Sequence, residues 1–476
     1  MSSFSKRTFG VFFLTALAAT LVVAPLVAAK ESSLADSYRQ LKVFTDVLAL
    51  VRKNYVKEVD VEDLIEGAIK GMLTSLDPHS GYLTPDLYKE LQVETKGEFG
   101  GLGIEITVKE GLLTVVAPIE DSPAFKAGVM AGDQIIKIED EFAKDLSLID
   151  AVKKMRGPKG SPVTISIFRQ GTKELIPITV IRDIIHVQSV RSRVLENGIG
   201  YIRLAQFQEG SAKEFRKALE SLYKSSEKDD LNGLVIDLRN NPGGLLSQAV
   251  RVADIFLNDG VIVYTDGRLE TQQQKFFARN DDNEPEFPIV VLVNGGSASA
   301  SEIVAGALQD HGRALILGDQ TFGKGSVQTV LPMDNSAALR LTTALYYTKS
   351  GRSIQAQGVK PDIIVSARRF PSDAEELLEE DEEAEEEASP TREEDLPGAI
   401  KNPKKNPKKK KDKKLSSKAN KQDRIRIGSR RAMTAELEDL LKDDPQLSEA
   451  LRLLKTWRIF RGSPIIQATK SSPASA

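Results

Sequence analysis

Apolar positions follow two different spacings along the chain, and these spacings predict helices and strands. Within Leu34–Glu94 the apolar residues recur every three or four positions, which predicts helices. From Gly198 onward, apolar runs at Ile199–Leu204, Leu234–Leu238 and Ile289–Val293 predict buried strands. A helical pattern that starts at Ser211 lies between the first two runs. The second half of the chain is therefore expected to form an α/β core.

The run Ile289–Val293 leads into a stretch that predicts a tight turn and then a helix. Asn294, Gly295 and Gly296 favour the turn, and the small residues that follow open a helix expected to end near Asp310. Ser299 would then lie near a helix N-terminus. Backbone N–H groups and the helix dipole favour developing negative charge at such a position.

A lysine flanked by two glycines, Lys324, follows a further apolar run, Ala314–Leu317. A serine hydroxyl becomes a good nucleophile only when a base takes its proton. A lysine can be that base only when it is neutral, so burial must lower its pKa toward about 7–8. Ser299 and Lys324 therefore suggest a serine–lysine dyad. The alternative is that Ser299 is a helix cap and Lys324 an ordinary surface lysine.

Three motifs lie in this part of the chain: LRNNPGG at 238–244, NGGSASASEI at 294–303 and TFGKGSVQ at 321–328. Together they resemble the carboxy-terminal processing proteases, also called tail-specific proteases. These are serine–lysine peptidases of family S41 that carry a PDZ domain. The resemblance covers roughly residues 35–370 and implies a core similar to the crotonase and Clp-protease architecture.

This resemblance implies a role for each motif. It makes Ser299 the nucleophile, Lys324 the base and Gln328 the residue that orients the lysine. Ser297 and Ser301 stay open as alternatives for the nucleophile.

The glycine turn that ends LRNNPGG is implied to form part of an oxyanion hole. The resemblance assigns this role to the backbone of Gly244, with Gly243 as the alternative, together with the backbone of Ala300. Without the nucleophile nearby, the same turn would be read as purely structural.

Residues from Glu98 to about Ile181 predict a small β-rich domain that resembles a PDZ domain. The run Gly100-Gly101-Leu102-Gly103-Ile104 resembles the carboxylate-binding loop, and the downstream Ala131-Gly132-Asp133 pattern agrees with it. Glycines let backbone N–H groups converge on a terminal carboxylate, and the adjacent strand edge can pair with an extended peptide. Gly101, Leu102, Gly103 and Ile104 are therefore the predicted peptide-binding residues, and Asp140–Met155 is expected to contain the helix that lines the groove.

Composition excludes several kinds of site. The chain has no cysteine, so disulfides and thiol catalysis are excluded, and its three scattered histidines predict no metal site. No cofactor is expected. His311 could pair with Ser299, but it would fall at the far end of the same helix, on the order of 18 Å away by helical rise.

Both ends of the chain differ from the middle in composition. Residues 1–29 combine Lys6 and Arg7 with the uncharged stretch Phe9–Ala29, which predicts an export signal or a retained membrane anchor.

The segment Arg369–Arg430 holds long runs of one charge sign and few aromatic residues. Such runs bury too little apolar surface to order a chain, so this segment is expected to be disordered and to make no packed contact with the site. Its lysine run is expected to be a solvated linker; as a binding segment it would favour anionic membrane surfaces or cell-envelope polyanions over nucleic acid.

These inferences predict one organisation of the chain. It consists of an export signal or anchor at 1–29, a helical region at 30–96, a PDZ domain at 97–183, a protease core at 184–368, a charged linker at 369–430 and C-terminal helices at 431–461 (Met433–Leu441 and Gln446–Phe460).

The expected function is that of an exported serine endopeptidase, in the periplasm or anchored in the inner membrane, that binds protein C-termini. An inactive PDZ adaptor and acyl-CoA chemistry on a crotonase-like core are the alternatives. A homo-oligomer, an envelope adaptor protein and a peripheral membrane contact stay open as partners.

Overall fold

The structure is a computed structural model that describes residues 36–461, apart from residues 37, 110, 226–230, 281–284, 367–390 and 404–443. Its contacts divide the chain into two compact units, residues 1–75 and residues 76–476. The predicted export signal lies outside the described residues. Among the residues that are described, no helix combines the length and the apolar character needed to cross a membrane.

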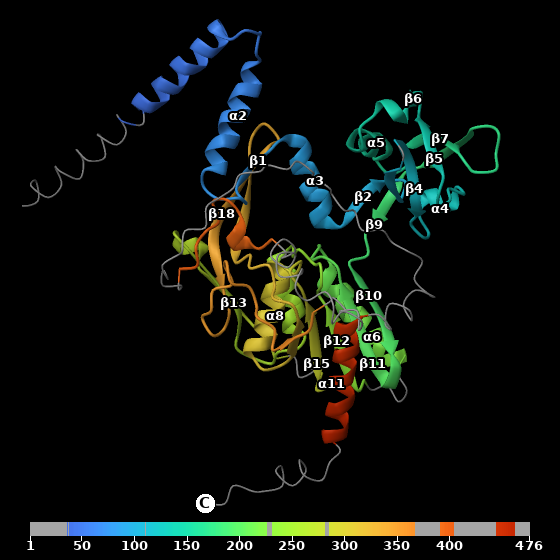
Figure 1. Ribbon diagram of the computed structural model, residues 1–476, viewed down its shortest axis with the longest axis vertical. Helices are drawn as coiled ribbons and strands as arrows, with labels where there is room; N and C mark the ends of the chain where they lie inside the picture. Colours follow the sequence, from blue (N-terminus) through green and yellow to red (C-terminus); the bar gives the residue numbers. More distant parts are fainter. Residues whose placement is uncertain are drawn as a thin grey trace, which may run out of the picture. The chain divides into compact units, whose positions relative to one another are not determined.

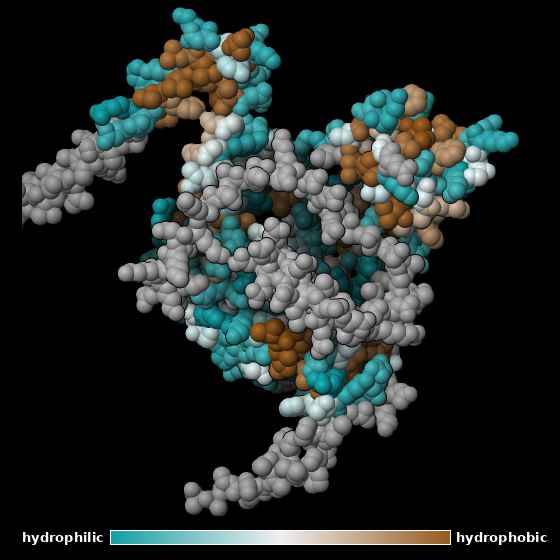
Figure 2. All heavy atoms as spheres, in the orientation of Figure 1, coloured by the Kyte–Doolittle hydropathy of each residue, from teal (hydrophilic) through white to brown (hydrophobic). Residues whose placement is uncertain are grey.

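The described part of the first unit is helical, as the spacing of its apolar residues predicts. One helix covers residues 38–54, and α2 covers Val61–Thr74. Apolar side chains lie along the surface of these helices (Figure 2), and Leu41, Val47 and Tyr55 are each more than half exposed. The three-to-four spacing therefore identifies the helix, but not a face that is buried within this unit.

The second unit opens with a short strand and a helix. They are β1 (Gly81–Leu83) and α3 (Pro85–Lys96). The Thr84 side chain caps the start of α3, and the helix ends at Gly97, whose φ of 72° is left-handed and costs glycine little.

A small β-rich domain follows, as predicted. Its entry and exit strands, β2 (Glu98–Gly101) and β9 (Asp183–His186), pair antiparallel. The main sheet has the order β3-β4-β5-β7-β8, with β6 beside β5. The bounds are β3 Ile104–Lys109, β4 Leu112–Pro118, β5 Gln134–Ile138, β6 Glu141–Phe142, β7 Pro162–Phe168 and β8 Ile176–Ile181, with helices α4 Pro123–Lys126 and α5 Leu148–Met155. Helix α5 is the helix expected within Asp140–Met155.

The α/β core is built on a sheet of order β10-β11-β12-β15-β16-β19 (Figure 1). Strand β10 is antiparallel to β11, and the later neighbours are parallel. The bounds are β10 Val190–Leu195, β11 Ile199–Leu204, β12 Gly233–Asp237, β15 Ile289–Val293, β16 Leu315–Gly318 and β19 Ile363–Ile364. Strands β11 and β15 end where the apolar runs predict.

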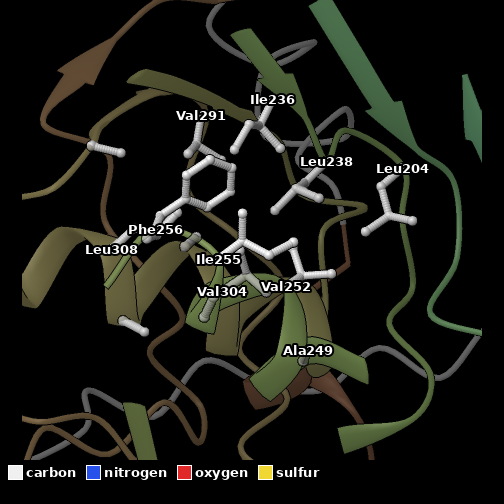
Figure 3. Packing of buried hydrophobic residues seen from close by; sticks show 14 of the residues in the cluster. Leu204, Ile236, Leu238, Ala249, Val252, Ile255, Phe256, Val291, Val304 and Leu308 are labelled. Carbon is white, nitrogen blue, oxygen red and sulfur yellow. The ribbon is translucent and has the colours of Figure 1, made fainter. Parts of the chain in front are cut away.

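Helices bury both faces of this sheet, because alternate residues of each strand point to opposite sides. On one face Ile236 and Val291 pack with α7 and α8 (Figure 3). Helix α6 belongs to the same hydrophobic core. On the other face Val235 and Leu292 pack with α11. The helices are α6 Ser211–Ser225, α7 Leu246–Asp254, α8 Ala300–Asp310 and α11 Pro445–Arg461. Continuous apolar strands are typical of sheets that are covered on both sides.

After the loop that contains Lys324, the chain continues as a strand of a second sheet. Its order is β1-β18-β13-β14, and β17 also pairs with β18. The bounds are β13 Val261–Gly267, β14 Gln274–Phe277, β17 Ser326–Pro332 and β18 Ala338–Tyr347. Because β1 pairs with β18 through Tyr82 and Leu339, the turn that precedes β1 lies beside this sheet.

The prediction that Arg369–Arg430 makes no packed contact is wrong for residues 391–403. This segment contains a short 3-10 helix, Glu393–Asp395, and both Glu393 and Asn402 are buried. A composition argument averages over the long charged runs and misses a short segment held by buried polar groups. Farther on, the helix predicted at Gln446–Phe460 is α11, whereas the one predicted at Met433–Leu441 lies outside the described residues.

Candidate active site

Ser299 occupies a strained turn between β15 and α8. It is the residue before the first turn of α8, and its φ of 54° and ψ of −111° are rare for any residue other than glycine. The glycine turn after β12 packs directly against it, since a side chain at Gly243 would bring a Cβ within 2.8 Å of Ser299 Cβ. Strain of this kind costs on the order of 1–3 kcal/mol and is typical of active sites.

The two rival serines have structural hydrogen bonds. Ser297 Oγ donates to Leu238 O at 2.8 Å and accepts from Asn294 N at 3.0 Å. Ser301 Oγ donates to Asn241 O at 2.9 Å, and both side chains are fully buried. Their hydroxyl groups therefore fix the turn and helix, whereas Ser299 is left as the candidate nucleophile.

Tyr346, a residue that the sequence reasoning did not single out, lies beside the Ser299 hydroxyl. Burial raises the pKa of Tyr346 to about 12, so the phenol is neutral beside the serine. Tyr346 lies in β18, where an apolar pattern predicts only a strand. No local signal marks it as a site residue.

Lys324 lies in the loop between β16 and β17, and this loop shares a hydrogen-bond acceptor with the turn that holds Ser299. The backbone N–H of Ser299 and that of Lys324 both donate to Glu302 Oε2, at 2.8 and 2.9 Å. The amides of the two predicted dyad members are therefore bound to one atom. Burial lowers the pKa of Lys324 below its ordinary 10.5, and the neighbouring Arg340 acts in the same direction.

Glu302 joins the two halves of the site. It is fully buried in the first turn of α8, and its Oε1 accepts hydrogen bonds from Thr321 Oγ1 at 2.5 Å and Gly323 N at 2.7 Å. Burial raises the pKa of Glu302 to about 7, while these bonds favour the carboxylate. The sequence places Glu302 at a helix start, but its role in fixing the lysine loop follows only from the tertiary structure.

The backbone geometry of the glycine turn distinguishes its two glycines. Gly243 N donates to Asn241 Oδ1 at 2.9 Å, so this N–H is already used. In the described part of the chain, no hydrogen bond is found for the N–H groups of Gly244 and Ala300. Ala298 N donates to Asn241 O at 3.0 Å and holds the turn against the serine. The geometry therefore favours Gly244 over Gly243 as a donor to a developing oxyanion.

Gln328 lies in β17, two strand positions beyond Ser326. Its Nε2 donates to Ser326 Oγ at 2.9 Å and to Thr342 Oγ1 at 3.4 Å. Among the residues described, no hydrogen bond joins Gln328 to Lys324. Its predicted role in orienting the lysine stays a prediction.

His311, the predicted rival of Lys324, and His79 occupy structural positions. His311 follows the last residue of α8, and its Nε2 is 2.9 Å from Val261 O, at the other end of the helix from Ser299. His79 lies in the turn before β1, and its Nε2 is 2.7 Å from Glu393 Oε2. Over the described ranges, no group of three or more His, Asp or Glu side chains is placed to hold a metal ion.

The predicted peptide-binding loop joins β2 to β3. Gly103 has a φ of 75°, and a Cβ there would lie 2.3 Å from Ser122 Cβ. Ser122 Oγ donates to Gly103 O at 2.9 Å, and Ala124 N donates to Leu102 O at 2.9 Å. The carbonyl groups of the loop are therefore engaged on the protein side. Within the described chain the N–H groups of Leu102 and Gly103 have no such bond.

Three family profiles match successive parts of the chain. The profile of Peptidase family S41 matches residues 198–365, that of the PDZ domain matches 100–180, and that of the Activating protease CtpB N-terminal domain matches 11–86. These matches agree with the regions in which the sequence motifs lie.

Individual relatives point the same way. The chain is 53% identical over 330 residues to the carboxy-terminal-processing protease of Bartonella bacilliformis. The alignment covers 69% of this chain and 76% of the relative. It is 34% identical over 372 residues to the carboxy-terminal processing protease CtpA of Bacillus subtilis, over 75% and 77% of the two chains. A solved structure of a photosystem II D1 C-terminal processing protease is 30% identical over 69% of this chain and 94% of that one, with a TM-score of 0.41. The family profiles and the two sequence relatives confirm the resemblance found in the motifs, and the chain belongs to the carboxy-terminal processing proteases, serine peptidases of family S41 with a PDZ domain.

Proposed function

We propose that Ser299 and Lys324 form the catalytic dyad of this peptidase and that it cleaves through an acyl-enzyme. The observation that carries this proposal is the shared acceptor, since Glu302 Oε2 binds the amides of both residues. The lowered pKa of Lys324 supports the same assignment, because a general base must be neutral in part of the population. Fixing both groups on one buried carboxylate also provides the orientation that catalysis needs.

The proposed reaction has the following steps. Neutral Lys324 takes the proton of the Ser299 hydroxyl as its oxygen attacks the scissile carbonyl. The N–H groups of Gly244 and Ala300 stabilise the oxyanion of the tetrahedral intermediate, a contribution that typically amounts to about 2.7–4 kcal/mol per donor. The Lys324 ammonium returns the proton to the leaving amine, and water then hydrolyses the acyl-enzyme with Lys324 as base.

The enzyme is further proposed to act on the C-terminal tails of exported proteins. The loop Gly101–Ile104 of the PDZ domain would bind the terminal carboxylate through its backbone N–H groups. The names of the relatives, which are carboxy-terminal processing proteases, support this substrate class. Export to the periplasm, with or without a retained inner-membrane anchor, is inferred from the charge and apolar pattern of residues 1–29.

The test of this function is the cleavage of a denatured protein by the wild type and by Ser299→Ala. Fragments are expected only with the wild type. Fragments from neither enzyme would favour the adaptor hypothesis, and equal fragments from both would exclude Ser299.

Cleavage is expected to depend on a free substrate carboxylate. An amidated peptide lacks the charge and leaves the loop N–H groups without an acceptor, so about 1–3 kcal/mol is lost, equal to about five- to a hundredfold weaker binding. The measurement compares kcat/KM for one peptide with free and amidated ends. Equal values would contradict recognition of the terminus.

Activity is also expected to rise with pH as Lys324 loses its proton, with a midpoint below the ordinary lysine pKa of 10.5. Arg340→Gln removes a positive charge that lowers this pKa, so the midpoint should move to higher pH. Arg352→Gln serves as the matched control, because it also removes an arginine charge. Arg352 donates a hydrogen bond to Gln309 Oε1. A pH profile of kcat that is the same for the three enzymes would contradict this role of Lys324.

A further inference from the structure

The segment 391–403, here called the strap, lies against the loop that carries Lys324. We propose that the strap holds this loop in its catalytic position and that Glu393 is the positioning residue through which it does so. The inference rests on the Ser299–Lys324 dyad proposed above. It adds a part of the chain that composition alone assigns to an inert linker.

The first contact is between the backbone of the strap and the loop itself. Glu393 N donates to Phe322 O at 3.2 Å, two residues before Lys324. Glu393 is fully buried although it belongs to a strongly acidic stretch of sequence. A buried carboxylate is expensive unless it is paired and hydrogen-bonded, so such a residue is normally held by specific partners.

The second contact reaches the other side of Lys324 through Gln355. Glu393 Oε1 accepts from Gln355 Nε2 at 2.9 Å, and Gln355 Oε1 accepts from Gly325 N at 2.9 Å. The packing there is close, since a Cβ at Gly325 would lie 2.2 Å from Gln355 N. Phe322 and Gly325, which bracket the catalytic lysine, are thus both tied to Glu393.

The C-terminal end of the strap also forms hydrogen bonds with Gln355. Asn402 Nδ2 donates to Gln355 O at 2.7 Å, and Gln355 Nε2 also donates to Ile400 O at 3.1 Å. Gln355 is fully buried between the two ends. The strap therefore fixes both the side chain and the backbone of the residue that supports Gly325.

The remaining oxygen of Glu393 connects the strap to the turn before β1. Its Oε2 lies 2.7 Å from His79 Nε2, and Arg340 Nε donates to His79 O at 2.9 Å. In the same turn, Asp77 Oδ1 accepts from Thr342 Oγ1 at 3.1 Å. The strap, this turn and β18 are therefore joined to one another by hydrogen bonds.

A need for such support follows from the sequence of the loop. Lys324 lies between Gly323 and Gly325, and glycine leaves the backbone free to adopt many conformations. Glu302 fixes the loop at Gly323 N and Lys324 N. Without the strap, Phe322 O would lose the hydrogen bond from Glu393 N. Gln355, which supports Gly325, would lose its bond to Glu393 Oε1. A displacement on the order of 1 Å at a catalytic group can cost about a hundredfold in rate.

The charges around Lys324 allow this role to be tested by pH. Arg340 lowers the pKa of Lys324, whereas the carboxylates of Glu393, Glu302 and Asp77 raise it. His79 faces Glu393, and Tyr346 faces Ser299. Removing the charge of Glu393 should therefore move the lysine-dependent limb of the rate profile to lower pH.

The experiment compares Glu393→Ala with Glu394→Ala in the full chain. Glu394 is the next residue and is exposed, so it is the matched control. We expect Glu393→Ala to lower kcat about ten- to a hundredfold, with KM nearly unchanged because Glu393 touches no predicted substrate-binding residue. Glu394→Ala should equal the wild type. Circular dichroism and a thermal melt identify a variant that has failed to fold.

The conservative variant Glu393→Gln separates positioning from a general loss of packing. Its amide oxygen can accept from Gln355, and its NH₂ can donate to His79 in the other tautomer. Glu393→Gln should therefore recover kcat to within about threefold of the wild type, since a neutral hydrogen bond replaces a charged one. Its rate profile should still show the shift to lower pH. Gln355→Ala should act through the same link, so adding it to Glu393→Ala should cause little further loss.

Two results would overturn the role of the strap. One is a folded Glu393→Ala enzyme with the kcat of the wild type. The other is a Glu393→Gln enzyme that is as slow as Glu393→Ala and has an unshifted profile. Ser299→Ala and Lys324→Ala belong in the same assay. If they retain turnover, the dyad itself fails, whereas inactive dyad variants beside a wild-type-like Glu393→Ala would refute the strap alone.

Discussion

Ser299→Ala and Lys324→Ala are each expected to reduce kcat by on the order of 10⁴-fold or more, because members of a catalytic unit act together and loss of either removes the activated nucleophile. Lys324→Arg should fail as well, since arginine stays charged and cannot take the serine proton. The measurement is the turnover of a C-terminal peptide with a free carboxylate. Thermal melts should show that all three variants remain folded.

Three substitutions nearby provide the controls. Ser297→Ala and Ser301→Ala remove hydroxyl groups that bond Leu238 O and Asn241 O, so they should lower stability by about 1 kcal/mol each but leave Ser299 as nucleophile. His311→Ala alters the opposite end of α8 and should keep its activity. Turnover by Ser299→Ala, or loss of turnover in His311→Ala, would contradict the serine–lysine assignment.

The strands and helices around the nucleophile could be predicted from the sequence because local signals agree there. The apolar run Ile289–Val293 is β15, and the helix expected to end near Asp310 is α8. Apolar runs, a glycine turn and small residues at the helix start all act over a few positions. Predictions that rest on such short-range patterns are the ones that the structure confirms.

The candidate site needed information that lies far apart in the sequence. Ser297, Ser299 and Ser301 have the same side chain within five positions. Only their surroundings separate them, since Ser297 and Ser301 donate to Leu238 O and Asn241 O, whereas Ser299 lies beside Tyr346. These neighbours come from other strands and turns. No periodicity or composition could provide these contacts.

The strap was missed for a related reason. The acidic and lysine-rich runs on either side dominate the composition of Arg369–Arg430, and they favour a solvated chain. The strap is held mainly by the buried polar groups Glu393 and Asn402. Hydropathy counts such residues as exposed, so a polar anchor has no sequence signal unless its partner is known.

Glu302→Gln is expected to lower kcat strongly, although Glu302 is not a member of the proposed dyad. Both carboxylate oxygens act only as acceptors, for Ser299 N and Lys324 N on one and for Thr321 Oγ1 and Gly323 N on the other. An NH₂ group in place of either oxygen meets an N–H that cannot accept a hydrogen bond. Thr321 Oγ1 already accepts from Val359 N, so it gives little relief.

No rotation of the new amide avoids this conflict, so the serine turn and the lysine loop should separate. Each buried group left without a partner costs about 1–3 kcal/mol, and kcat should fall about a hundredfold or more. Asp310→Asn is the control, because Asp310 is hydrogen-bonded at the other end of the same helix. It should lose stability but keep kcat. If Glu302→Gln retained both its melting temperature and its kcat, the shared carboxylate would not be what brings Ser299 and Lys324 together, and the dyad would need another means of alignment.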